Sequence, residues 1–300
     1  MNTVDLENYN FISEGGVGYI EKKRGLIEVS GKEAIQFLNG LITNDVAKLE
    51  DGAAMLAAFP NAQGRLLAVV GVMRAGDKFL FVTEAATREK VFQNLFRFTY
   101  AGDFYVDDLS EKYLCFSITN YELRIANYES IEIQNRFGRD VFVPNESASD
   151  FLEELNSKPA VEVSDELYEV LRVESGFPLY GVDMDETTIV PELGIDGLIS
   201  YNKGCYIGQE IIARIHFRGH VAKQLTGLML SGDSTEIDLK NAELKSVEDK
   251  NAGRITSAVF SPKLGKFIAL AYVRYDYLAE GTELKIGDRT GTVKNLPFVG

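Results

Sequence analysis

The eight residues 203–210, Lys-Gly-Cys-Tyr-Ile-Gly-Gln-Glu, place a cation, a thiol and two glycines in one short segment. Cys205 is one of only two cysteines, and the apolar stretch 211–215 that follows it predicts a helix. The positive end of a helix dipole and a nearby ammonium group both favour thiolate over thiol. Because Lys203 is only two residues from Cys205, we expect the Cys205 thiol to be the leading candidate for a reactive nucleophile.

The second cysteine has a different setting. Cys115 lies in the apolar, strand-like run 113–118 and is expected to be a buried small hydrophobe. No disulfide framework is indicated. A zinc site could formally combine both cysteines with His216 and His220, but the cysteines belong to different segments and Gly219 interrupts the helical spacing of the histidines. We therefore expect no metal.

Glu174 is a second candidate functional residue. It ends an amphipathic helical pattern that starts near Val163, and it precedes a Gly/Pro-containing turn at 176–178. A carboxylate gains nothing from the dipole at the C-terminal end of a helix. Two interpretations remain open: a salt bridge to Arg172 or Lys203, or a carboxylate that accepts two N–H bonds from a planar heterocycle such as a pterin or guanine.

The chain is acidic, with a formal net charge of −14 over 300 residues, which argues against general nucleic-acid binding. The segment from Lys203 to Lys223, however, contains four Lys or Arg residues and one acidic residue, Glu210, which gives a local charge of +3. This basic segment indicates either a site for a specific anion or a solvated helix face. No apolar run reaches membrane-spanning length, and the N-terminus resembles neither a signal nor a transit peptide, so we expect a cytoplasmic protein.

The pattern of elements predicts a mixed α+β protein. A capping-box pattern at Ser30 and Glu33 predicts a helix over 34–38 that stops at Gly40. The turn 60–64 joins apolar runs at 53–59 and 66–73 into a hairpin. Beyond a boundary near 219–223, short strands alternate with turns and predict a small β-barrel or sandwich; they are expected at 225–230, 255–260, 267–273, 283–286 and 291–295.

The segment 203–210 resembles the signature of the YgfZ-type folate-binding proteins, which are relatives of the glycine-cleavage aminomethyltransferase, or T-protein. The resemblance extends along almost the whole chain in several ordered blocks. These are 31–46, ending Leu-Ile-Thr-Asn-Asp-Val; Gly-Arg-Leu-Leu at 64–67; the Arg-x-Glu-x-Gly…Tyr-Gly…Pro block within 171–191; and the Ser-Pro-containing barrel motif within 255–273.

The resemblance implies an α+β fold with three domains in a ring around a central folate cavity. Two antiparallel α+β domains would be interleaved in sequence, and a β-barrel would follow. The expected boundaries are 1–49 with 146–218 for the first folate-binding domain, 50–145 for the second domain and 219–300 for the barrel.

The resemblance also implies site residues and a cofactor, tetrahydrofolate. Glu174 would contact the pterin, Lys203 would occupy a cationic folate-contact position, and Tyr180 and Arg65 would line the wall. One departure separates this chain from the aminomethyltransferases, which carry paired aspartates just after the Gly-x-Leu/Ile-Leu turn. Ala68 and Val69 occupy those positions here, and neither can accept or orient a proton.

The implied function is that of a tetrahydrofolate-binding accessory protein for assembly or repair of iron–sulfur enzymes, including enzymes that modify tRNA, with Cys205 as the reactive group. Its partners would be folate and iron–sulfur enzymes or assembly proteins, with no direct contact to nucleic acid or membrane. Two alternatives are an aminomethyltransferase of the glycine-cleavage type, which Ala68 and Val69 disfavour, and a non-catalytic folate-sensing scaffold in which Cys205 is structural.

Overall fold

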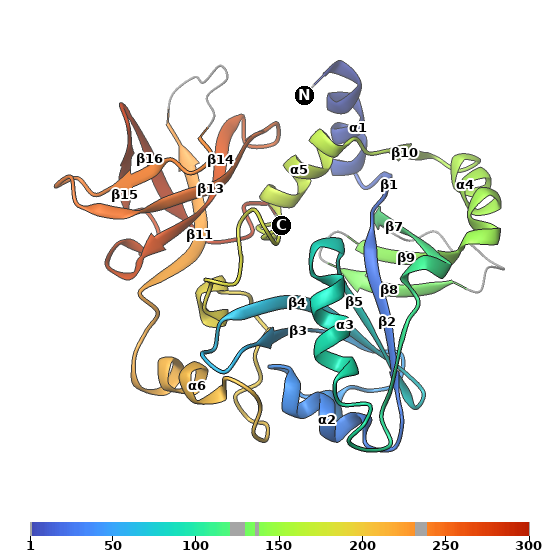
Figure 1. Ribbon diagram of the computed structural model, residues 1–300. Coiled ribbons are helices and arrows are strands. Elements are labelled where there is room, and N and C mark those ends of the chain that lie inside the picture. Colours follow the sequence, from blue (N-terminus) through green and yellow to red (C-terminus); the bar gives the residue numbers. More distant parts are fainter. Residues whose placement is uncertain (1, 121–129, 136–137, 232–238, 300) are drawn as a thin grey trace. The chain divides into compact units, whose positions relative to one another are not determined.

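The computed structural model describes residues 2–120, 130–135, 138–231 and 239–299 (Figure 1). The chain divides into two compact units, one formed by Met1–Ser164 and Asp196–Glu210 and the other by Asp165–Ile195 and Ile211–Gly300. The chain therefore passes between the two units three times. The segment that carries Cys205 belongs to the first unit, although the stretches that directly flank it, Asp165–Ile195 and Ile211–Gly300, belong to the second.

One sheet of the first unit follows the order β3-β4-β5-β2-β6 with antiparallel pairing throughout. Helices α2 (Ala34–Leu41) and α3 (Arg88–Phe96) cover one face through an apolar cluster that includes Leu38 and Leu95. Alternation along the strands sends every second side chain into this cluster. The strands are β2 (Arg24–Ser30), β3 (Ala54–Pro60), β4 (Leu66–Ala75), β5 (Lys78–Glu84) and β6 (Tyr105–Asp108).

The second sheet of this unit has the order β10-β1-β7-β9-β8. Helix α4 (Ala148–Asn156) packs on its outer face through Phe151 and Leu155. The inner face of this second sheet packs against the first sheet in a shared apolar cluster that contains Leu26, Cys115 and Phe142. The layers are thus helices, sheet, sheet and helix. The strands are β1 (Val17–Glu21), β7 (Tyr113–Thr119), β8 (Ile131–Asn135), β9 (Gly138–Pro144) and β10 (Ala160–Glu162); α1 (Thr3–Ser13) precedes β1.

The second unit is built on a closed barrel of six strands in the order β11-β14-β13-β12-β15-β16. Helix α5 (Asp165–Glu174) contacts β13 and β14, and its Val173 shares an apolar cluster with Leu270 and Tyr272. Helix α6 (Gln209–Arg218) leads into the barrel. The barrel strands are β11 (Lys223–Leu230), β12 (Glu243–Lys245), β13 (Asn251–Ser261), β14 (Lys266–Arg274), β15 (Glu283–Ile286) and β16 (Arg289–Lys294). Short 3-10 helices span 46–48, 85–87, 110–112, 145–147, 190–193 and 275–277.

The predicted α+β class and the C-terminal barrel are confirmed, and the barrel is closed rather than an open sandwich. The hairpin of β3 and β4 is also confirmed. The predicted capping box is wrong, because Glu33 is the N-cap residue and its carboxylate instead accepts a hydrogen bond from the Asp103 amide at 2.7 Å. Helix α2 also continues through Gly40 to Leu41.

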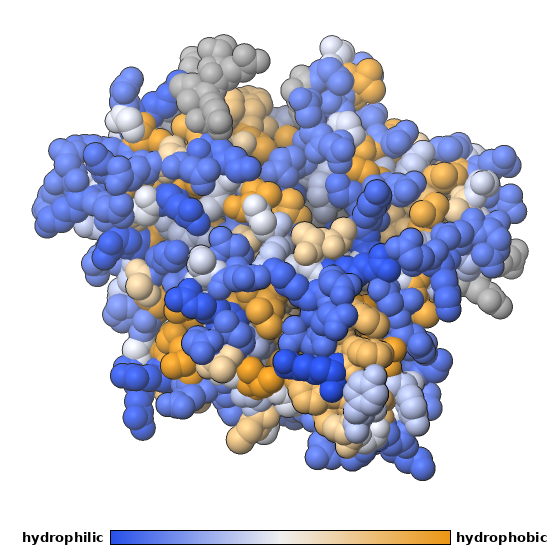
Figure 2. Space-filling model, viewed as in Figure 1, coloured by the Kyte–Doolittle hydropathy of each residue, from blue (hydrophilic) through white to orange (hydrophobic). Residues whose placement is uncertain are grey.

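Hydrophilic side chains cover most of the face in Figure 2, with apolar side chains in small separate areas. No helix among the described residues is long and apolar enough to cross a bilayer.

Candidate functional site

The segment that carries Cys205 is held against residues 40–44 by a series of hydrogen bonds. The buried Thr43 hydroxyl donates to the Leu198 carbonyl at 2.7 Å and accepts from the Ala58 amide at 2.9 Å. The Asn44 side-chain amide donates to the Gly197 carbonyl at 2.7 Å, and the Ile207 amide donates to the Gly40 carbonyl at 3.0 Å. The fold therefore fixes this segment through side chains that are distant in sequence.

Lys203 completes this attachment. Its ammonium group donates to the carbonyl oxygens of Ile42 at 2.8 Å and Asn44 at 2.6 Å, and it lies 5.1 Å from the centre of the Tyr206 ring. Burial lowers the pKa of Lys203 to about 8, while the charge of Asp45 acts in the opposite direction. At neutral pH the group is therefore still mainly a cation, and a third N–H remains for a ligand.

Cys205 is a free, exposed cysteine, whereas Cys115 is free and buried, as predicted. Burial, assisted by the charge of Asp140, raises the pKa of the Cys115 thiol well above its ordinary value. The predicted helix after Cys205 is present, but α6 begins only at Gln209. Cys205 therefore lies four residues before the first residue of this helix.

A close backbone approach joins the thiol segment to the β3–β4 turn. Gly208 has φ +79°, and a Cβ there would lie 2.4 Å from the Asn61 carbonyl oxygen. Only glycine fits both requirements. Arg65 is exposed in the same turn, and its amide donates to the Asn61 side chain at 3.0 Å. The structure therefore brings the backbone that carries Arg65 close to the Cys205 segment.

Ala68 and Val69, where the resemblance implies an aspartate pair in aminomethyltransferases, are consecutive residues of β4. Ala68 has no exposed surface and belongs to the helix-facing core of the first sheet, and Val69 is 7% exposed. Both side chains are apolar and packed. The site therefore lacks the acid group at these two positions.

Glu174 ends helix α5 in the second unit, and its residue is 5% exposed. Its carboxylate accepts a hydrogen bond from the Ser261 hydroxyl at the end of β13. Its carbonyl oxygen accepts from the Phe298 amide at 2.9 Å. Gly176, at φ +70°, makes the turn that follows. The barrel and the C-terminal segment thus hold this carboxylate in place.

Arg172 braces the same helix end. Its guanidinium, with no exposed surface, pairs with Glu169 at 2.5 Å and Asp183 at 2.7 Å and donates to Ser257 at 2.7 Å. Asp183 in turn accepts from Thr256. Arg172 is one of the two salt-bridge partners considered for Glu174, but its described ion pairs are with Glu169 and Asp183 instead. These contacts form a buried network that orients α5 on the barrel.

The predicted site residues fall into two groups. Lys203, Cys205 and Arg65 belong to the first unit, and Glu174 and Tyr180 belong to the second. Tyr180 is half-buried and forms a backbone bridge with Met184. The joint folate cavity stays a prediction.

Sequence reasoning missed three supporting residues: Thr43, Asn44 and Ser261. The signal for the first two was their place in the Leu-Ile-Thr-Asn-Asp-Val block, and for the third its place before Pro262 in the barrel motif. A hydroxyl or amide in such a block does not reveal its long-range partner; Leu198, Gly197 and Glu174 are 155, 153 and 87 residues away along the chain from Thr43, Asn44 and Ser261.

Comparison with known proteins agrees with this architecture. Residues 16–119 match the GCVT N-terminal domain, and residues 223–298 match the glycine cleavage T-protein C-terminal barrel domain. The chain therefore belongs to the GcvT-like superfamily. It is 28% identical to an aminomethyltransferase of Thermotoga maritima, over 91% of this chain and 83% of that protein. It is also 28% identical to an aminomethyltransferase of Halothermothrix orenii, over 92% and 86%.

A solved structure shows the same fold. The glycine cleavage system aminomethyltransferase T from Bartonella henselae superimposes with a TM-score of 0.85 over 98% of this chain and 89% of that chain, at 20% sequence identity.

Proposed function

We propose that this protein binds tetrahydrofolate and serves as an accessory protein for assembly or repair of iron–sulfur enzymes, with Cys205 as its reactive group. The observation that carries the proposal is an exposed free thiol on a segment that Lys203 fixes to the fold, in a chain whose aspartate positions are apolar. The YgfZ-like signature at 203–210 supports this branch of the superfamily.

The residues suit a folate. A pterin edge offers adjacent N–H donors, and Glu174 is a carboxylate held in one orientation by Ser261. Lys203 retains an N–H donor and a positive charge for a carbonyl or carboxylate group of the ligand. Tyr180 and Arg65 complete the proposed wall. When bound, tetrahydrofolate would supply one-carbon chemistry.

Folate binding is tested by calorimetry with tetrahydrofolate under anaerobic conditions. Glu174→Ala and Lys203→Ala should each weaken binding about tenfold or more, because each removes a charge-assisted hydrogen bond. Lys112→Ala, at an exposed position of the first unit away from these residues, is the matched control. Unchanged affinity in both site variants would show that the ligand lies elsewhere.

The thiol role has its own test. In the folded protein a thiol reagent should modify one cysteine rapidly, Cys205, and reach the buried Cys115 only after denaturation. In a strain that lacks this gene, Cys205→Ala should fail to restore the activity of iron–sulfur enzymes, including those that modify tRNA, while Cys115→Ala should restore it. Full restoration by Cys205→Ala would rule out the thiol role.

Aminomethyl transfer is the second candidate, because the relatives in the comparison carry that name. The packed, apolar Ala68 and Val69 weigh against it, since neither can handle a proton near the folate amine. A glycine-cleavage assay with lipoylated carrier protein distinguishes the two functions, and turnover there would favour transfer. Folate binding without turnover, together with an inert Cys205, would favour the non-catalytic scaffold.

A further inference from the structure

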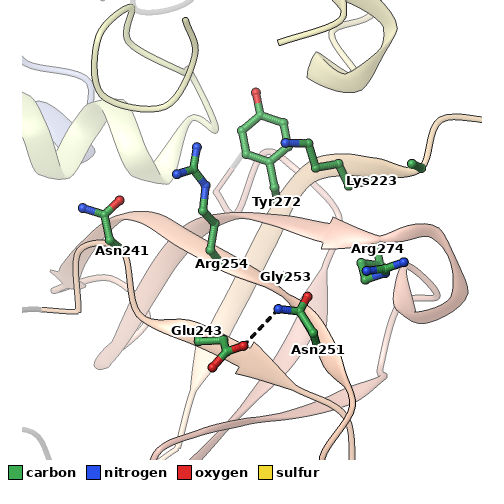
Figure 3. Close-up of a pocket in the computed structure, with 9 residues that line it drawn as sticks. Lys223, Asn241, Glu243, Asn251, Gly253, Arg254, Tyr272 and Arg274 are labelled. Carbon is green, nitrogen blue, oxygen red and sulfur yellow. Dashed lines mark hydrogen bonds between the residues drawn. The ribbon is translucent and has the colours of Figure 1, made fainter. Parts of the chain in front are cut away.

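A pocket of about 450 Å³ lies on the second unit, beside the ends of the barrel strands β11, β13 and β14. Figure 3 shows the residues that line it. Antiparallel pairing places Arg254 directly opposite Tyr272, and Lys223 directly opposite Arg274. Residues opposite each other, and residues two apart on one strand, share a face of the sheet. These four side chains therefore belong to one face.

Tyr272 is the unusual member of this group. Its residue is only 2% exposed, and its hydroxyl is buried without a hydrogen-bond partner among the described residues. Burial raises the pKa of Tyr272 well above its ordinary value, the Thr188 side chain acts in the opposite direction, and the charges of Glu192, Asp183 and Asp185 raise the pKa further. The hydroxyl is therefore a protonated donor at neutral pH. A buried hydroxyl without a partner is costly, so its presence indicates a missing acceptor.

The charges of the lining favour an anion as that acceptor. Lys223, Arg254 and Arg274 outnumber the one acid, Glu243, which gives the lining a charge of +2. The Lys223 ammonium lies 4.7 Å from the centre of the Tyr272 ring. Within the described part of the chain, neither arginine has a carboxylate within 4.0 Å.

The acids around the pocket have partners of their own. Glu243 accepts a hydrogen bond from the Asn251 amide at 3.0 Å. Hydrogen bonds from Thr187 hold the pKa of Asp185 below its ordinary value, with smaller contributions from Arg254 and Lys223. Glu192 lies 4.0 Å from the Lys223 ammonium. These acids reduce the positive field, yet among the described residues neither guanidinium group has a carboxylate within 4.0 Å and the tyrosine hydroxyl has no hydrogen-bond partner.

We propose that this pocket binds a small oligoanion, through its carboxylate or phosphate groups, by means of Arg254, Arg274, Lys223 and the Tyr272 hydroxyl. Arginine forks match the planar or tetrahedral oxygens of both groups, and asparagine amides at the rim add neutral donors. The site is separate from the residues assigned above to folate, and it does not depend on folate binding.

Calorimetry on the full-length protein with inorganic pyrophosphate and, separately, with citrate tests the proposal. One of the two should bind with a stoichiometry of one, and its affinity should fall as sodium chloride is added. Tighter binding of pyrophosphate would identify phosphate as the recognised group, and tighter binding of citrate would identify carboxylate. Failure of both to bind would overturn the proposal.

Two variants assign the binding to this pocket. Arg254→Gln should weaken it about tenfold, because a charge-assisted hydrogen bond is lost. Tyr272→Phe should also weaken it several-fold without lowering the melting temperature, because the hydroxyl has no hydrogen-bond partner among the described residues. A purely structural tyrosine would show the opposite pattern. Lys263→Gln, with the same charge change in a distant turn, is the control. Unchanged affinity in both pocket variants would overturn the proposal, whereas Glu174→Ala should leave pyrophosphate and citrate binding intact even if it abolishes folate binding.

Discussion

The Ser261 hydroxyl donates a hydrogen bond to the Glu174 carboxylate across 87 residues of sequence. Ser261 has no exposed surface, and the Leu264 amide donates to the same hydroxyl oxygen at 3.2 Å. The turn after β13 therefore orients the serine, and the serine orients the carboxylate at the end of α5. The hydrogen bond between Ser261 and Glu174 therefore fixes, against the barrel, the carboxylate that we propose to contact the pterin.

Ser261→Ala should reduce the free energy of unfolding by about 1–3 kcal/mol, because a buried carboxylate loses a donor. It should also weaken tetrahydrofolate binding about tenfold, since Glu174 would no longer be held in one orientation. Urea denaturation and calorimetry measure the two effects. Ser231→Ala, which removes an exposed barrel hydroxyl bonded to Thr290, is the matched control. Normal folate affinity in Ser261→Ala would separate this serine from the site.

Lys203 should give the stability of the protein a distinctive pH dependence. Burial lowers its pKa from 10.5 to about 8, so between these values the unfolded chain binds more protons than the folded chain. The contribution of Lys203 to the free energy of unfolding therefore rises with pH across this window. Denaturation at pH 7.5 and 9.5 measures the free energy of unfolding of the wild type and of Lys203→Met. The wild-type value minus the Lys203→Met value should be larger at pH 9.5 than at pH 7.5. A difference that does not grow with pH would contradict the lowered pKa.

The same titration bears on the ligand. Tetrahydrofolate binding that depends on the Lys203 cation should weaken as the pH rises through about 8. This pH dependence should be absent in Lys203→Met.

Gly208→Ala should disturb the thiol segment, because the residue has φ +79° and the new Cβ would meet the Asn61 carbonyl oxygen. We expect a loss of about 2 kcal/mol or more in the free energy of unfolding from strain and the backbone contact together. Gly204→Ala provides a control in the same segment, because nothing lies within 4 Å of its added Cβ. Equal stability of the two variants would exclude the close approach at Gly208.

Ala68→Asp restores an acid of the aminomethyltransferase type in a fully buried core position. An unpaired carboxylate there should cost about 3–5 kcal/mol, so the variant should be much less stable and should gain no aminomethyl transfer. Ala75→Asp, at the exposed end of the same strand, should have little effect. A stable and active Ala68→Asp would revive the transferase function.

The sequence predicted elements whose signals are local. Apolar periodicity located α5, the β3–β4 hairpin and the barrel strands, because such patterns depend on neighbours within one turn or one strand. The capping box failed because a tertiary partner, the Asp103 amide, competes for the Glu33 carboxylate.

The candidate site was predictable as residue types but not as contacts. Cys205, Lys203 and Glu174 stood out through their motifs, but the partners of Lys203 and Glu174 come from segments far away in sequence. Tyr272 gave no signal at all, since one tyrosine in a strand pattern is an ordinary core residue. Its hydroxyl distinguishes it, because this buried group has no hydrogen-bond partner among the described residues.

The return of Asp196–Glu210 to the first unit has a consequence for synthesis of the protein. Thr43 and Ile42 meet Leu198 and Lys203 across 155 and 161 residues. A nascent chain must therefore be about two thirds complete before the hydrogen bonds of Ile42 and Thr43 to this segment can form. Contacts of such long range slow folding. No single proteolytic cut can release either unit intact. The exposed Cys205 thiol is thus positioned late, after most of the polypeptide has left the ribosome.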